Sequence, residues 1–284
     1  MTTRWTTHGV DLLPGSVRKR FRTDPHGAPP GDPGCEPERE WRALTLLDRY
    51  APGLAPRPLA REDGTLTMSR LPGRALRGTV LTDEHLDALA RAVRRLHRAV
   101  PAELVARLPN RRWDVRQSAE TIRDRAAGAA AVGGDAPEVL RALTAGLRWL
   151  DRAQAGLCAD GPAAAPVLGQ ADGNLANFLW DGTGVRLVDF EDSGRSDHPY
   201  ELAEVVEHVS SWVDTDLDAA AFLSRFDLSP AEDRRLLECR RLLALLWLVF
   251  LAGDPATTLR NPPDTPARQA RRLLALLDAA EPSG

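Results

Sequence analysis

Lysine is almost absent from this sequence, because Lys19 is the only one among 37 lysine and arginine residues. A coding bias toward arginine could leave a single lysine by chance, or a function could preserve it. No G-x-x-x-x-G-K-[ST] phosphate loop surrounds this lysine. G-x-G-x-x-G, G-x-S-x-G and H-E-x-x-H are missing as well, which removes several common nucleotide, hydrolase and zinc-protease signatures.

Cysteine is also scarce, with Cys35, Cys158 and Cys239 far apart in the chain. Three such residues suggest neither a disulfide framework nor a C-x-x-C metal site. We therefore expect a reducing compartment and a cytoplasmic protein.

Long apolar runs and strong charge of one sign are missing too. The longest apolar run, residues 242–252, is about half of the roughly 20 residues that a membrane-spanning helix needs. The first ten residues contain no apolar core of a secretory signal. The net charge of −3 comes from mixed acidic and basic residues and indicates no basic face. We expect a buried core helix at 242–252 and neither a membrane nor a nucleic acid as partner.

The first part of the chain has the pattern of strands followed by a helix. A turn at Pro14-Gly15 separates two short alternating stretches, and the second places Lys19 and Phe21 on one face. Residues 37–50 have helical periodicity, and Glu40 points inward with the apolar residues.

The pattern then changes from strands to helices. A connector follows the last strand pair, and Thr82 can cap a helix that begins a mostly helical region. We therefore predict an α+β fold of two lobes. The β-rich lobe would span residues 1–73, with a hinge at about 68–73, and the helical lobe residues 74–284. The alanine- and glycine-rich residues 126–136 predict a loop or a poorly ordered tip.

The residues that carry chemistry lie around a predicted hairpin. Its strands, residues 178–180 and 185–187, are joined by a turn so that Phe178 faces Leu187. Asn177 and Asp189 then lie together at the open end. Amide and carboxylate oxygens are suitable ligands for Mg²⁺.

Asp172 can reach the same end of the hairpin from the preceding loop. Phosphoryl transfer uses a metal ion to neutralise phosphates and a carboxylate to orient and deprotonate the accepting hydroxyl. Alternatively, Asp172, Asn174 and Asn177 are ordinary loop residues in Asx-turns.

The order of these parts resembles the aminoglycoside phosphotransferase and choline kinase-like family, which has a protein-kinase-like fold. The family's His-Gly-Asp, Asn and Asp-Phe stations are similar to Gln170-Ala171-Asp172, Asn177 and Asp189-Phe190. The similarity extends over about residues 10–250 and is strongest at 166–203.

The resemblance implies a role for each matching residue. Lys19 would contact the phosphates of ATP or GTP and pair with Glu40, Asp172 would be the catalytic base, and Asn177 and Asp189 would hold Mg²⁺. The backbone of one further segment would read the purine. This segment consists of Met68, Ser69, Arg70 and Leu71.

The chain departs from the family at three places. Gln170 replaces a histidine, and an amide offers a donor and an acceptor in a similar position. Glu191 replaces the glycine of Asp-Phe-Gly. The region before Lys19 has no G-x-G-x-x-G, so the loop that covers the phosphates is either reduced to residues 6–9 or missing.

The acceptor is not determined by these motifs. Glu191, Asp192, Asp197 and Glu201 would attract a cationic acceptor, or they form a solvated acidic face; Asp197 can also cap a helix. We expect a phosphotransferase for an aminoglycoside or nucleoside antibiotic. A kinase for an amino alcohol or sugar and an inactive nucleotide- or small-molecule-binding protein are alternatives. The oligomeric state stays open.

Overall fold

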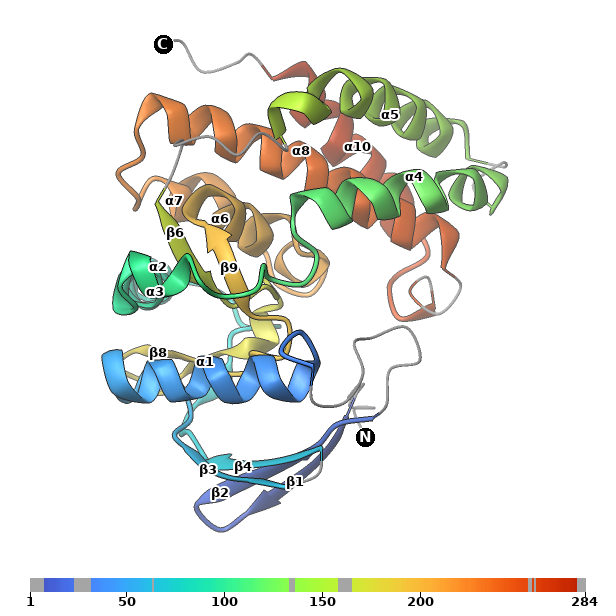
Figure 1. Cartoon of the computed structure of the whole chain (residues 1–284). Helices are drawn as coiled ribbons and strands as arrows, with labels where there is room; N and C mark the ends of the chain where they lie inside the picture. The colour runs from blue at the N-terminus through green and yellow to red at the C-terminus, as the bar shows by residue number, and fades with distance from the viewer. Residues whose placement is uncertain are drawn as a thin grey trace. The chain divides into compact units, whose positions relative to one another are not determined.

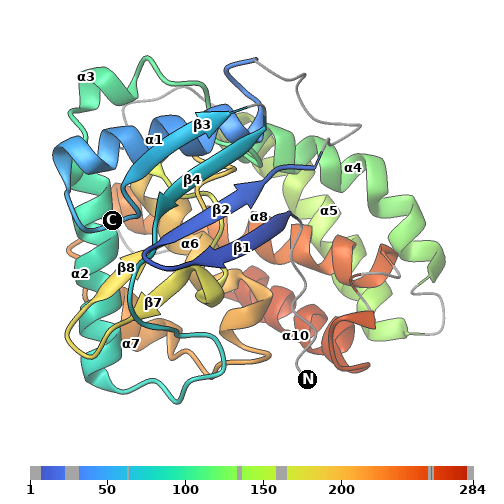
Figure 2. The same cartoon turned by 90° about the horizontal axis from the view of Figure 1, so that it is seen from below.

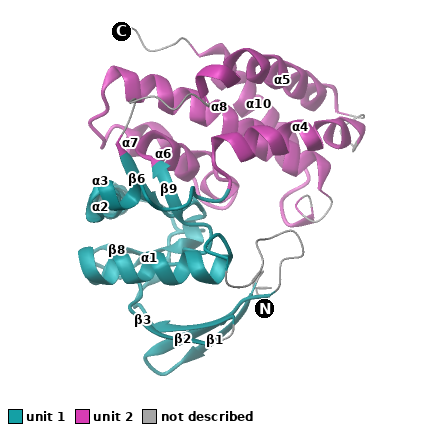
Figure 3. Cartoon of the chain, viewed as in Figure 1, with its two compact units in different colours: residues 1–112, 166–196 teal, residues 113–165, 197–284 magenta. Residues whose placement is uncertain are grey.

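The structure is a computed structural model in which the chain forms two compact units (Figure 3). Residues 1–112 and 166–196 form the first unit, and residues 113–165 and 197–284 form the second. The lobe boundary predicted at about residues 68–73 falls inside the first of these units. The division into lobes at this hinge stays a prediction. The structure describes residues 8–22, 32–62, 64–132, 136–157, 165–254, 257 and 259–279.

The first unit contains a four-stranded antiparallel sheet with the order β1-β2-β4-β3. Its strands are β1 (Gly9–Leu13), β2 (Ser16–Arg20), β3 (Pro58–Glu62) and β4 (Thr65–Ser69). The predicted turn joins β1 to β2, and Gly15 adopts a positive φ of 75° there, which glycine does at little cost. Helix α1 (Glu36–Tyr50) packs on β3 and β4 (Figure 2).

The rest of the first unit holds the predicted hairpin and its supports. β5 (Arg74–Ala75) pairs with β7 (Phe178–Trp180), which pairs with β8 (Val185–Leu187). β6 (Pro166–Gly169) lies beside β9 (Gly194–Asp197). Helix α2 (Asp83–Ala99) packs on β6 and β8, and α3 (Ala102–Val105) packs on β6. Thr82 is the N-cap of α2, as predicted.

The second unit is a bundle built around α8 (Pro230–Gly253) (Figure 1). Four helices pack on α8: α4 (Val115–Val132), α5 (Pro137–Leu157), α6 (His198–Glu207) and α10 (Thr265–Asp278). Nearly all of residues 242–252 are buried, which confirms the core helix. The second unit also contains the 3-10 helix Val209–Ser211 and the short α7 (Ala219–Leu223).

The predicted α+β fold, with a small β-rich N-terminal region and a mostly helical C-terminal region, is confirmed. The loop or poorly ordered tip predicted at residues 126–136 is wrong for residues 126–132, because α4 continues to Val132. Residues 133–135 lie outside the described residues. Alanine has the highest helix propensity of the amino acids, which favours a helix here. The helix is also held by packing, because the buried Ala129 lies close to Gly253. No helix within the described residues has both the length and the apolar content needed to cross a bilayer. Cys35 and Cys239 are buried and are not in a disulfide, and Cys158 lies outside the described residues.

Candidate active site

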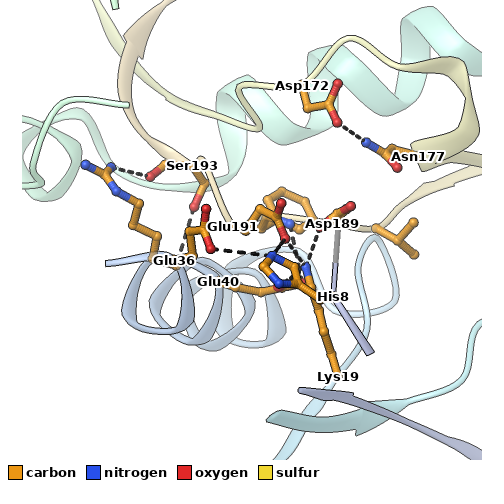
Figure 4. A network of polar contacts seen from close by, with 12 residues as sticks. His8, Lys19, Glu36, Glu40, Asp172, Asn177, Asp189, Glu191 and Ser193 are labelled. Carbon is orange, nitrogen blue, oxygen red and sulfur yellow. Dashed lines mark hydrogen bonds and ion pairs between the residues drawn. The ribbon is translucent and has the colours of Figure 1, made fainter. Parts of the chain in front are cut away.

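Lys19 lies among three carboxylates in the first unit (Figure 4). Its Nζ donates to Glu40 Oε2 at 2.7 Å and to Asp189 Oδ1 at 2.5 Å. A third contact, also 2.5 Å long, joins Nζ to Glu191 Oε2. The lysine and glutamate side chains at 19 and 40 are only 8 % and 1 % exposed. The single lysine of the chain is therefore the centre of a largely buried ion cluster.

Local structure explains how three distant segments supply these groups. Alternation along β2 buries Lys19 while Arg18 and Arg20 point to solvent. Glu40 lies on the inner face of α1, as its spacing predicted. Asp189 follows β8 with a φ of 66°, a conformation that is uncommon for a residue with a side chain. Such a conformation is often found at functional sites.

Burial and neighbouring charges shift the pKa values of the residues in this ion cluster, and not all in the same direction. Burial raises the pKa of Glu40 to about 7, although the charge of Lys19 opposes the shift. Burial likewise raises the pKa of Asp189. Burial would also raise the pKa of Glu191, but contacts with His8 and Lys19 outweigh it and hold this pKa at about 2. Burial lowers the pKa of Lys19, yet the three carboxylates raise it well above its usual value.

Asp172 lies on the loop between β6 and β7 and is fixed by two hydrogen bonds. Asn177 Nδ2 donates to its Oδ2 at 2.7 Å, and the backbone amide of Asn174 donates to its Oδ1 at 2.9 Å. Burial raises the pKa of Asp172 to about 6, and the negative charge of Asp189 adds to this shift. The carboxylate is thus oriented, and its pKa lies close to neutral pH.

The hairpin has the predicted register, since Phe178 pairs with Leu187. The backbone amide of Val188 donates to Asn177 O at 3.0 Å, so the pairing continues to the open end. Gln170 Nε2 donates to Val188 O at 2.6 Å. This amide therefore ties the loop of Asp172 to the segment of Asp189, and the replacement of histidine at position 170 leaves a working hydrogen bond.

His8 is a member of the cluster that the sequence analysis did not single out. It is 4 % exposed, and its Nε2 lies 2.9 Å from Glu191 Oε2 and 3.4 Å from Glu36 Oε2. Its Nδ1 accepts from the backbone amide of Arg22 at 3.1 Å. Burial lowers the pKa of His8, but Glu191 outweighs this and raises it. In the sequence, the only indication that His8 belongs to the site was its position just before β1, within residues 6–9.

The residues present fit a hard divalent cation. Because Asn177 uses Nδ2 to bind Asp172, its Oδ1 is left to act as a ligand. The side chain of Asp189 is 37 % exposed and is accessible at the rim of the cluster. Glu40, Asp189 and Glu191 offer carboxylate oxygens within 4.8 Å of one another. Amide and carboxylate oxygens are the ligands that Mg²⁺ prefers, and the roles of Asn177 and Asp189 stay predictions.

The predicted purine-reading segment begins at the end of β4. Met68 is buried, and the backbone amide of Ser69 donates to Arg57 O at 2.9 Å. The amide of Arg70 donates to Gly15 O at 3.0 Å. The role of this segment in binding a nucleotide stays a prediction.

The four acidic residues predicted to attract an acceptor do not lie in one compact unit. Glu191 belongs to the lysine cluster, and Asp192 lies 3.5 Å from Arg112, with burial raising its pKa to about 7. Asp197 and Glu201 lie in the second unit, where Asp197 caps α6 and also contacts Arg235 at 3.0 Å. The capping role of Asp197 is confirmed, and the acceptor role of all four stays a prediction.

Solved structures of several phosphotransferases share this fold. The chain is similar to a choline/ethanolamine kinase family protein from Mesorhizobium loti, with 17% identity over 97% of this chain and 87% of that chain and a TM-score of 0.58. It is similar to a spectinomycin phosphotransferase in complex with ADP and spectinomycin, with 10% identity, coverage of 96% and 89%, and a TM-score of 0.59. A microcompartment-associated aminopropanol kinase has 20% identity, coverage of 95% and 90%, and a TM-score of 0.57. These likenesses define a kinase-like fold.

The sequence itself gives the family. Residues 21–236, more than half of the chain, match the phosphotransferase enzyme family. The chain therefore belongs to the phosphotransferase enzyme family, and the resemblance inferred from its motifs is confirmed. It is a small-molecule phosphotransferase whose acceptor group is a hydroxyl. No curated protein matches the sequence.

Proposed function

We propose that this enzyme transfers the γ-phosphoryl group of ATP or GTP to a hydroxyl of an aminoglycoside or nucleoside antibiotic, as a cytoplasmic resistance or self-protection enzyme. The observation that carries the proposal is the pairing of Lys19 with Glu40 and Asp189 beside the bonded pair of Asp172 and Asn177 (Figure 4). Related structures hold ADP with spectinomycin, GDP, and gentamicin, which supports a nucleotide donor and an antibiotic acceptor.

Lys19 binds the phosphates in this mechanism. Its ammonium keeps its charge at neutral pH, because the three carboxylates raise its pKa well above the usual value. Phosphate oxygens compete with Asp189 and Glu191 for Lys19 Nζ, while the buried Glu40 keeps its contact and holds the side chain in place.

Asp172 serves as the base. Its hydrogen bonds to Asn174 and Asn177 fix the carboxylate, and a pKa of about 6 leaves most of it ionised at neutral pH. The acceptor hydroxyl gives its proton to Asp172 as its oxygen forms a bond to the γ-phosphorus. The bond between this phosphorus and the β–γ bridging oxygen breaks, and the nucleoside diphosphate leaves.

Asn177 Oδ1 and the carboxylate of Asp189 would hold Mg²⁺. When bound, the ion neutralises negative charge on the phosphate oxygens.

A panel of acceptors tests the proposal. γ-Labelled ATP and GTP are offered with Mg²⁺ to spectinomycin, gentamicin, a nucleoside antibiotic, choline, ethanolamine and aminopropanol. We expect labelled product from an antibiotic and none from Asp172→Ala. Label on choline, ethanolamine or aminopropanol alone supports an amino-alcohol kinase, the candidate that the fold likeness to such kinases favours.

A further inference from the structure

Arg111 is a buried arginine that reaches the loop of Asp172. The residue is only 2 % exposed. Its Nη2 donates to Ala171 O at 3.0 Å, and the two residues are 60 positions apart in the sequence. Its Nε donates to Arg112 O at 3.0 Å. The guanidinium therefore joins the segment before α4 to the carbonyl of the residue next to Asp172.

The backbone around Arg111 is itself fixed. Its amide donates to Arg195 O at 3.0 Å, and the amide of Arg195 donates to Pro109 O at 2.9 Å. A Cβ at Gly194 would lie 2.6 Å from both Arg111 N and Pro109 O, so this close pairing requires glycine. Backbone hydrogen bonds to the first residues of β9 thus hold the arginine in place, and its side chain can hold a second segment.

The carbonyl that Arg111 binds belongs to a strained residue. Ala171 has a φ of 71°, in the left-handed region that residues with a Cβ rarely adopt. Glycine adopts such a conformation readily, and glycine stands at this place in the His-Gly-Asp motif that the chain resembles. Alanine at position 171 needs an outside contact that favours this conformation over the ordinary ones.

We propose that Arg111 is a positioning residue that holds Ala171 in its left-handed conformation and thereby directs the carboxylate of Asp172. A guanidinium is always charged and makes strong hydrogen bonds to a carbonyl in a buried environment. A loop free to relax at Ala171 turns the following residue away from its place. The inference rests on the proposed role of Asp172 as the base.

The first test compares Arg111→Met with a matched control. Arg241 is also buried, at 5 % exposure, and donates to two carbonyls, Leu276 O and Ala279 O, in the second unit. We expect Arg111→Met to lower kcat by about 10- to 100-fold with little change in KM for ATP, because the base is misplaced. Arg241→Met lowers the melting temperature and leaves kcat unchanged. Equal behaviour of the two variants overturns the proposal.

The second test is a double-mutant cycle with Ala171→Gly. Glycine removes the strain at position 171, so the loop needs the arginine less. We expect the loss of kcat caused by Arg111→Met to be at least about threefold smaller in the Ala171→Gly background. A general loss of stability would give the same loss in both backgrounds, and that result contradicts the coupling.

Hydrogen exchange keeps this inference separate from the proposed function. We expect the amides of residues 170–174 to exchange faster in Arg111→Met than in the wild type or in Arg241→Met. If the wild type transfers no phosphoryl group to any panel acceptor or to water, the proposed function fails and exchange alone decides the role of Arg111. If Asp172→Ala is inactive while Arg111→Met keeps its full kcat, only the present inference fails.

Discussion

Glu191 Oε2 lies as close to Lys19 Nζ as Asp189 Oδ1 does, at 2.5 Å. Glu191 stands where the Asp-Phe-Gly motif has glycine, so the departure from that motif adds a third carboxylate to the lysine. The same glutamate contacts His8 at 2.9 Å. The replacement of this glycine is therefore also a change in the charge around the lysine that we propose binds the phosphates.

Neutralising this third carboxylate should favour the nucleotide. In Glu191→Gln, one competitor for Lys19 loses its charge, and we expect KM for ATP to fall by about two- to fivefold. Initial rates over a range of ATP concentrations measure the effect. A tenfold rise in KM would instead show that Glu191 itself helps to bind the nucleotide or its metal.

Lys19→Arg separates function from coding bias. Arginine is the usual basic residue of this chain, so a purely compositional lysine would tolerate the change. A planar guanidinium cannot replace a compact ammonium among three carboxylates within 2.7 Å, and we expect kcat/KM to fall about 100-fold. Arg18→Lys on the exposed face of β2 is the control. Wild-type kcat/KM in Lys19→Arg would remove the lysine from the mechanism.

Asp172→Ala should abolish turnover and leave nucleotide affinity nearly unchanged. In the proposed mechanism the carboxylate takes the acceptor proton, and loss of a general base costs about 10²- to 10⁴-fold. Transfer of labelled phosphate gives kcat, and the thermal shift with Mg²⁺ and nucleotide gives binding. Full activity of this variant would exclude Asp172 as the base.

Asp189→Asn should mainly change the response to Mg²⁺. An amide keeps the shape of the side chain but loses the charge that attracts the ion. We expect the Mg²⁺ concentration for half-maximal rate to rise more than tenfold, as measured by titration of the rate with MgCl₂. If turnover and its Mg²⁺ response both persist, Asp189 does not hold the metal.

The pH dependence should report Asp172. Burial and the charge of Asp189 raise its pKa from the usual 3.8 to about 6, and only the ionised form can accept a proton. We therefore expect kcat/KM to fall tenfold per pH unit below about pH 6 and to level off above it. Asp189→Asn removes the negative charge that helps to raise the pKa of Asp172. The midpoint of the pH profile should therefore move to a lower pH in any activity that this variant keeps. A profile that stays flat down to pH 5 would contradict a base with this pKa.

The hairpin shows how much local pattern can predict. Its register followed from two short apolar stretches around a turn, and the structure has the same pairing of Phe178 with Leu187. The helix cap at Thr82 and the inward face of Glu40 were also predicted. Each of these depends on residues close in sequence. The alanine-rich end of α4 was misjudged because packing on α8 decides whether such a stretch stays helical.

The sequence by itself determined the family, the α+β order of elements and the residues of the candidate site, since motif spacing and periodicity survive without knowledge of the fold. Only the tertiary structure decided that Glu191 and His8 join the lysine cluster and that Arg111 supports Ala171. These contacts join segments far apart in the chain. Their pKa shifts depend on burial and on neighbouring charges, which exist only after the chain has folded.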